Sequence, residues 1–465
     1  MNGSMSVAAW VCVIGLAATV TAQPPPTPGD PTASQPAAAG EPALVKVPDA
    51  LNGKNPTHKL VAQEVPEAGK PFRDPCFGTK LTRVTQQPGI RHEYARYDPF
   101  NQDGTLIVLV EVSEYDIRVY RTDSIPYEAK ANLVCKLDLE QPRWDPNSAD
   151  VIWGFRDFQI RTVNVRTGKT TVVKDFSKDR TVGPLLKAEP DLYRITTKDE
   201  GESSMDMRYW ALVLQGSKHD HALRHIVTWD RQKDLVLGVC HIREEERNVD
   251  CVGMSPLGNW VWIGGDWNNG GRMAGLTLAN KELTQFYHLD YATGHSDVGL
   301  DADGREVVVM QNCRTDHIDM IPLDPKTRPV TEMEHYKSSN RTPLVRLFYA
   351  DDSPQGCHCG VHICCNMPGW CVVSPHLDPS VKEQNWLDRS IILVRLKPGK
   401  PEAYYLAKIH TTTGAYWEGT HAVMSSDGSR ILWASNWGQN VGKDRPFLMQ
   451  LDMPRNWQAA DRRAR

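Results

Sequence analysis

One pattern of apolar and polar positions recurs along the chain. Each copy has a short strand-like segment, a turn, a strongly apolar segment, and a third segment in which apolar and polar residues alternate. The turns lie at 97–104, 144–146, 205–208, 254–258, 303–304, 368–369 and 427–428. Apolar runs after such turns are typical of buried strands, and alternation is typical of strands with one solvent-facing side. The pattern therefore predicts short antiparallel strands throughout.

The copies form seven units of roughly 40 to 60 residues, a period typical of propeller repeats. A lone strand over 76–85 precedes the first unit, and the seventh ends at Phe447–Asp452 with nothing after it to complete its sheet. Pairing these two segments removes exposed sheet edges. We therefore expect an all-β fold, a seven-bladed β-propeller closed by an N-terminal strand. A β-sandwich with extra strands is the alternative.

This architecture predicts a ring of side chains at one mouth of the central channel. Aligning the turns places one residue of each innermost strand there: Tyr94, Gln141, Glu200, Cys251, Asp297, His362 and His421. Side chains two residues apart on a strand share a face, which adds His92 and His295. Imidazoles gathered on a rigid rim suit Zn, Mn and related metals. A structural histidine bonded to backbone is the alternative at each position.

The run from 354 to 373 is dense in cysteine and histidine. Cys357, Cys359, Cys364, Cys365 and Cys371 accompany His358 and His362. The spacing differs from the two separated Cys-x-x-Cys pairs of a zinc ribbon. Adjacent cysteines on a strand point to opposite faces, so Cys364 and Cys365 do not easily share one ion. Disulfides, metal ligation and buried thiols all stay open.

The N-terminus predicts export. Residues 1–22 resemble a signal peptide, with an apolar stretch over 7–20 and a small-residue cleavage site, and 23–50 form a Pro/Ala-rich linker. The propeller is then expected over 51–465, in a periplasmic or secreted protein without a membrane span in its mature chain. The formal net charge of −4 gives no basic field for nucleic acid. The oligomeric state stays undetermined.

Two segments resemble a known family. Phe77–Thr85 and Thr420–Gly428 are similar to TolB-like propellers, and especially to the oligogalacturonate lyases. The resemblance implies a divalent metal, Mn in that family, bound by one histidine and a later Gln-x-x-His-x-His cluster. His295 fits the first ligand, and Gln355 with His358 fit the start of the cluster.

This chain departs from the family pattern at the next ligand position, where Gly360 stands. His362 or His421 would have to supply the missing nitrogen. A neighbouring cysteine is the other source, and it would favour Zn over Mn.

The resemblance also implies an activity, metal-assisted β-elimination on an acidic polysaccharide or oligosaccharide that contains uronate. Such a reaction needs a positive group beside the carboxylate and a base for the adjacent proton. The family uses a histidine base with an assisting arginine, for which His241 and Arg208 are the candidates, with His92 and Tyr94 as alternative bases. His241 could equally end a strand, and Arg208 could be a solvated residue after a turn. A non-catalytic propeller that binds a glycan or a protein is the alternative function.

Overall fold

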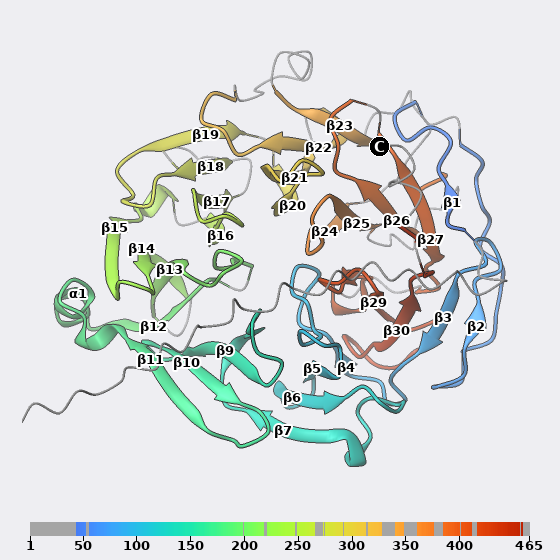
Figure 1. Ribbon diagram of the computed structural model, residues 1–465, viewed down its shortest axis with the longest axis horizontal. Coiled ribbons are helices and arrows are strands. Elements are labelled where there is room, and N and C mark those ends of the chain that lie inside the picture. The colour runs from blue at the N-terminus through green and yellow to red at the C-terminus, as the bar shows by residue number, and fades with distance from the viewer. Residues whose placement is uncertain are drawn as a thin grey trace, which may run out of the picture. The chain divides into compact units, whose positions relative to one another are not determined.

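The computed structural model describes residues 43–458, apart from 53–54, 199, 218–220, 247–248, 266–272, 274, 292, 313–314, 328–339, 348–359, 376–384, 400, 412–415 and 456. The described residues form seven antiparallel sheets, which Figure 1 shows as blades around a common centre. The protein is a seven-bladed β-propeller, as the spacing of the turns predicts.

Five blades contain four strands each, in chain order. The first blade comprises β4 (Ile90–Arg91), β5 (Leu106–Glu111), β6 (Asp116–Arg121) and β7 (Leu133–Leu137), and the second β8 (Glu140–Trp144), β9 (Val151–Arg156), β10 (Gln159–Asn164) and β11 (Thr170–Asp175). The third comprises β12 (Leu192–Thr196), β13 (Tyr209–Gly216), β14 (Ala222–Asp230) and β15 (Leu235–His241). The fourth comprises β16 (Val249–Met254), β17 (Val261–Gly265), β18 (Leu276–Ala279) and β19 (Phe286–Asp290), and the fifth β20 (Thr293–Leu300), β21 (Glu306–Asn312), β22 (His317–Pro322) and β23 (Thr342–Arg346).

The last two blades each take strands from the N-terminal side of the chain. The sixth comprises β24 (Val361–Cys364), β25 (Trp370–Pro375), β26 (Ser390–Arg395), β27 (Ala403–Lys408) and, at its edge, β1 (Val45–Lys46). The seventh comprises β28 (Val423–Met424), β29 (Arg430–Ser435), β30 (Phe447–Asp452), β3 (Lys80–Arg83) and β2 (Phe72–Arg73).

The closure of the ring follows the expectation from the sequence. β3 pairs with β30, with Lys80 opposite Asp452 and Arg83 opposite Met449, and Lys80 Nζ lies 3.0 Å from Asp452 Oδ2. β1 also pairs with β27, so residues within the segment that composition assigns to the linker take part in the sixth sheet. Edge pairing by so short a strand needs only backbone hydrogen bonds, which the composition of a segment does not reveal.

The turns recur because their residues satisfy the same hydrogen bonds. Asp103 Oδ1 accepts a bond from the Thr105 N–H at 3.0 Å, and Asp427 Oδ1 accepts one from the Ser429 N–H at 2.9 Å. The intervening Gly104 and Gly428 have φ angles of 67° and 69°, a region that glycine enters without steric cost. An aspartate followed by glycine therefore begins the same turn in blades far apart in sequence.

The core lies between neighbouring blades. Every residue of β21 is buried, as are the first five residues of β5. Trp153 of β9 packs against Trp210 of β13 with ring centroids 6.0 Å apart, which joins the second and third blades. A strand covered by a blade on each face has no polar side, which explains the continuous apolar runs in the sequence.

Helices are few and short in the described part of the chain. They are α1 (Val182–Ala188) and the 3-10 turns Lys130–Asn132, Phe176–Lys178, Glu244–Glu246 and Tyr416–Glu418. Within the described ranges, no helix has both the length and the apolar character needed to cross a bilayer.

Candidate functional site

Three histidines from consecutive blades meet at the channel. His295 lies in β20 of the fifth blade, His362 in β24 of the sixth, and His421 two residues before β28 of the seventh. The ring centroids of His295 and His362 are 4.7 Å apart, and those of His362 and His421 are 3.9 Å apart. We call these three residues the histidine cluster. Its members are separated by more than fifty residues in sequence and come together only because the blades close into a ring.

Hydrogen bonds orient His421 within the histidine cluster. Its Nδ1 lies 2.8 Å from the Gly419 carbonyl oxygen, an arrangement in which Nδ1–H donates and Nε2 carries the lone pair. His92 Nε2 lies 2.6 Å from the His421 carbonyl oxygen and donates to it. A carbonyl that fixes the tautomer of an imidazole is a common support for metal-ligating histidines.

His92 contacts the backbone of His421 through one of its ring nitrogens. Its side chain is buried, and burial lowers its pKa to about 4, so it is neutral at ordinary pH. Because its Nε2–H is committed to the His421 carbonyl, that nitrogen does not serve as a proton acceptor. The structure thus places the predicted alternative base His92 as a support for His421.

Aromatic side chains surround the histidine cluster. The Tyr94 ring lies 5.6 Å from that of His362 and 5.5 Å from that of His421, and Tyr416 Oη donates to Tyr94 Oη at 3.2 Å. Trp417 stacks on His421 with centroids 5.4 Å apart, and the Arg91 guanidinium lies 3.6 Å from the Trp417 ring centre on its face. The predicted residue Tyr94 is therefore in direct contact with the cluster.

A buried arginine that the sequence did not single out sets the charge beside the cluster. Arg96 follows Tyr94 by two residues, and its side chain is 4% exposed. Its Nη2 lies 2.8 Å from Glu200 Oε2, and its Nη1 donates to the Glu200 carbonyl at 3.0 Å and to Cys251 Sγ at 3.7 Å. The period of two that relates His92 to Tyr94 reaches Arg96 at the next step and could have identified it.

The charge of Arg96 affects the neighbouring titrating groups. Burial, followed by the Arg96 guanidinium, lowers the pKa of His295 to about 4, which keeps that imidazole neutral. Burial, followed by the charge of Glu200, raises the pKa of Tyr94 well above its ordinary value although Arg96 opposes the shift. Burial also raises the pKa of Asp297, another predicted rim residue, to about 6. The neutral imidazole of His295 and the protonated phenol of Tyr94 therefore share the site.

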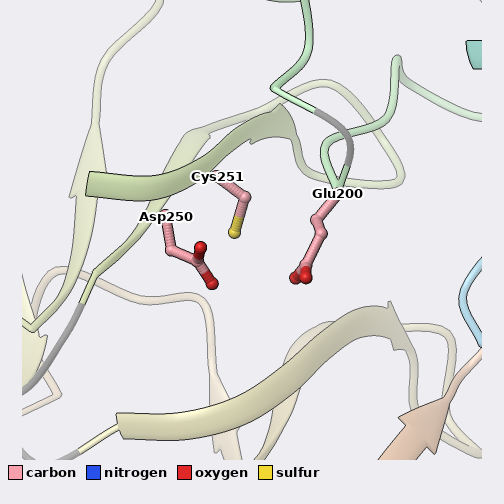
Figure 2. A group of neighbouring side chains, drawn as sticks. All are labelled: Glu200, Asp250 and Cys251. Carbon is pink, nitrogen blue, oxygen red and sulfur yellow. The ribbon is translucent and has the colours of Figure 1, made fainter. Parts of the chain in front are cut away.

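A second group of possible metal ligands lies on the side of the third and fourth blades. Glu200, Asp250 and Cys251 each offer a ligand atom, and these atoms lie within 4.8 Å of one another (Figure 2). A register shift in β16 between Val249 and Cys251 lets Asp250 and Cys251, adjacent on one strand, both extend toward Glu200. We call these three residues the carboxylate–thiol group. Burial raises the pKa of Cys251 to about 12, so its sulfur is a protonated thiol.

Two predicted catalytic residues lie away from the histidine cluster. Arg208 follows the turn before β13 and pairs with Asp230 at 3.0 Å. His241 ends β15, the last strand of the third sheet, and its ring lies 5.1 Å from that of His225. The predicted metal ligands Gln355 and His358 fall outside the described residues. The structure thus brings together His295, His362, His421 and Tyr94 from the predicted set.

A cavity of about 270 Å³ opens on the turn side of the channel. Its lining includes the turn residues Asp98, Asp145 and Ser426, together with Glu200 and Asp297. Residues from blades far apart in sequence thus share one central space. The carboxylate–thiol group contacts this space through Glu200.

Comparison with known proteins supports the fold. No family model matches the sequence, and no curated protein does. Among solved structures, the chain is similar to an oligogalacturonate lyase in complex with manganese, with 12% identity, a TM-score of 0.55, and coverage of 85% of this chain and 98% of that one. It is also similar to an oligogalacturonate lyase from Vibrio parahaemolyticus, with 12% identity, a TM-score of 0.54, and coverage of 83% and 97%. At this level of identity the likeness establishes a lyase-like propeller fold.

Proposed function

We propose that this protein is an exported, periplasmic or secreted, metal-dependent lyase that cleaves a uronate-containing oligosaccharide by β-elimination. The observation that carries the proposal is the histidine cluster, which lies beside Tyr94 at the centre of a fold shared with oligogalacturonate lyases. Three imidazoles on or next to the inner strands of three blades form a set of nitrogen donors that no local sequence spacing reveals.

The donor chemistry of the three imidazoles suits a divalent cation, although among the described residues only Glu200, Asp250 and Cys251 hold their ligand atoms within 4.8 Å of one another. His295 is neutral, the form in which imidazole ligates a metal, and the Gly419 carbonyl holds His421 in the tautomer whose Nε2 carries the lone pair. Gln355 and His358 would complete the set implied by the family resemblance. Manganese, present in the similar lyase structure, and zinc both accept such ligands. When bound, the cation would supply positive charge next to the substrate carboxylate, where negative charge develops as the adjacent proton leaves.

The residues of the chain itself then bind charge and move protons. Arg96 provides a fixed positive charge beside the cluster, and a uronate carboxylate would compete with Glu200 for it. Glu200 is held at 2.8 Å from Arg96 and would accept the proton on the carbon beside the carboxylate once that pairing is shared with substrate. Tyr94, whose raised pKa keeps it protonated, would donate a proton to the expelled sugar oxygen.

The aromatic residues give the substrate a surface to lie on. Tyr416 and Trp417 form one 3-10 turn with Glu418, and their rings are 5.0 Å apart. Tyr416 is 48% exposed, so part of its ring stays open to solvent beside the Tyr94 hydroxyl. Aromatic faces of this kind stack on the apolar faces of sugar rings, which would orient the glycosidic bond toward Tyr94.

The direct test is ultraviolet absorbance, because β-elimination creates a double bond conjugated with the carboxylate. We expect an absorbance gain on a panel of acidic oligosaccharides that is lost on chelation and restored by manganese or zinc. As a matched control, His288→Gln changes a histidine on β19, in the outermost position of the fourth sheet, and should retain activity. If metal is bound but no acidic oligosaccharide gives an absorbance gain, the protein is a non-catalytic propeller instead.

A further inference from the structure

Two cysteines face each other across the hairpin that begins the sixth blade. β24 and β25 pair antiparallel with Cys364 opposite Val372, and one step nearer the turn the same register sets Cys365 opposite Cys371. The Cys365 N–H donates to Asp297 Oδ2 at 2.6 Å, so it is not directed at the Cys371 carbonyl. When two opposed residues of an antiparallel pair share no backbone hydrogen bonds, their Cα atoms lie about 4.5 Å apart. A disulfide joins residues whose Cα atoms are about 4.4–6.8 Å apart, so this spacing permits one.

The side chains of these two residues meet in a buried position. Cys365 is 5% exposed and Cys371 is fully buried, and both are thiols in the structure. Burial, followed by a hydrogen bond with the Cys371 thiol, raises the pKa of Cys365 well above its ordinary value. Cys365 also lines the central cavity.

The neighbouring Cys364 has a different environment. Its sulfur accepts a hydrogen bond from the Met424 N–H at 3.3 Å, so it faces the seventh blade rather than the hairpin partner. This follows from the alternation of side chains along a strand. The hairpin therefore contains one opposed pair of cysteines and one cysteine bonded elsewhere, which makes Cys364 a built-in control.

We propose that Cys365 and Cys371 form a disulfide that clips the β24–β25 hairpin, made by exchange with an external disulfide such as oxidised glutathione. One cysteine loses its proton and attacks a sulfur of the oxidant, which releases one thiolate and leaves a mixed disulfide. The second cysteine loses its proton, attacks the protein sulfur of that mixed disulfide and releases the other thiolate. The cysteine pair loses two electrons and two protons, and the oxidant becomes two thiols.

The position of this bond gives it a role at the centre of the propeller. β24 carries His362, and the Cys365 amide holds Asp297 on β20, the strand that also carries His295. A Cβ atom added to Gly299 of β20 would lie 2.7 Å from Cys365 Cβ, so the backbone of the fifth blade lies close to the proposed disulfide. The bond would thus fix the end of the strand that positions His362 next to the fifth blade. This inference does not depend on the lyase proposal.

The test is disulfide mapping on the full-length chain refolded in a glutathione redox buffer. After acid quenching, alkylation and digestion, we expect a peptide in which Cys365 is linked to Cys371 and whose mass is lower by two hydrogens than that of the reduced form. The link should vanish in Cys371→Ser and persist in Cys364→Ser. Full alkylation of both cysteines in the folded, unreduced protein, or a link from either one to another cysteine, would overturn the proposal.

Thermal unfolding detects the disulfide in the wild-type chain itself, without relying on a variant that folds well. Reduction should lower the melting temperature of the wild-type chain and of Cys364→Ser by a few degrees, because the unfolded chain regains freedom. The double variant Cys365→Ser/Cys371→Ser should not respond to reductant. An unchanged melting temperature in the wild type, or a metal ion that the two thiols retain in place of a bond, would contradict the clip.

Discussion

Two sides of one channel carry different chemistry although the residues of both lie on, or within a few residues of, the first strand of a blade. The fifth to seventh blades provide the histidine cluster, and the third and fourth provide the carboxylate–thiol group. Arg96, from the first blade, pairs with Glu200 and contacts Cys251, so a positive charge already occupies that side. A metal ion there would face the guanidinium directly, whereas in the histidine cluster the same charge acts beside His295, whose imidazole is neutral and can ligate a metal. The types of donor atom alone therefore do not identify a metal site. The charges of the residues around those atoms also determine whether a cation binds there.

Removing one imidazole should have the largest effect. His362 contacts both other members of the histidine cluster, so His362→Ala should abolish metal binding by the histidine side and lower the rate of β-elimination by at least about 100-fold. Metal content by mass spectrometry and the absorbance assay check this together. His288→Gln serves as the control. Retention of stoichiometric metal by His362→Ala would shift the site to the other side of the channel.

Removing the positive charge of Arg96 should mainly lower the stability of the side of the channel formed by the third and fourth blades, where Arg96 pairs with Glu200 and contacts Cys251. Arg96→Met leaves Glu200 without its ion-pair partner, which costs about 3–5 kcal/mol for a buried pair, and the loss should shrink when Glu200→Gln is added. Urea unfolding measures both variants. For comparison, Lys80→Met breaks an exposed ion pair and should cost less than about 1 kcal/mol. Equal losses for Arg96→Met and Lys80→Met would show that Arg96 is not holding the carboxylate–thiol group.

A smaller effect should follow from loosening the support of His421. His92→Phe removes the hydrogen bond to the His421 carbonyl and should weaken metal affinity about 10-fold, as expected for a residue that orients a ligand. His92→Gln keeps a donor and should restore much of the affinity. Isothermal titration with manganese compares them. If both variants bind metal like the wild type, the orientation of His421 does not depend on His92.

The smallest effect concerns a buried histidine outside the channel. His410 stacks on Trp437 with centroids 3.9 Å apart, and burial, followed by the charges of Arg389 and Lys408, lowers its pKa to about 4. Between about pH 6.5 and this value the unfolded chain binds a proton that the folded chain does not, so stability falls as pH falls through that window. His410→Asn should show a shallower decline in melting temperature from about pH 7 to about pH 5. An identical decline would assign the pH dependence to other groups.

The sequence predicted the architecture well because its signals are local. An Asp-Gly turn and the apolar run after it specify a blade, and repetition specifies the ring. The convergence of His295, His362 and His421 could be foreseen by aligning turns. The pairing of Arg96 with Glu200 could not, because it joins the first blade to the third across the channel.

The spacing of residues along the chain also gave little information about how far each residue lies from the axis of the propeller. Residues at a strand end can lie at the channel or at the periphery, depending on which strand of the blade they occupy. His241 ends the last strand of its sheet, and Arg208 follows a turn and pairs with Asp230. Both were candidates from order in the sequence alone. Placing them would have required knowing that His241 lies on the last strand of its sheet and that Arg208 pairs with Asp230.

A crystal structure of the manganese-soaked protein with anomalous scattering data would locate the metal site directly. We expect one strong anomalous peak among the imidazoles of His295, His362 and His421. A peak bound by Glu200, Asp250 and Cys251 instead, with none at the histidines, would contradict this expectation.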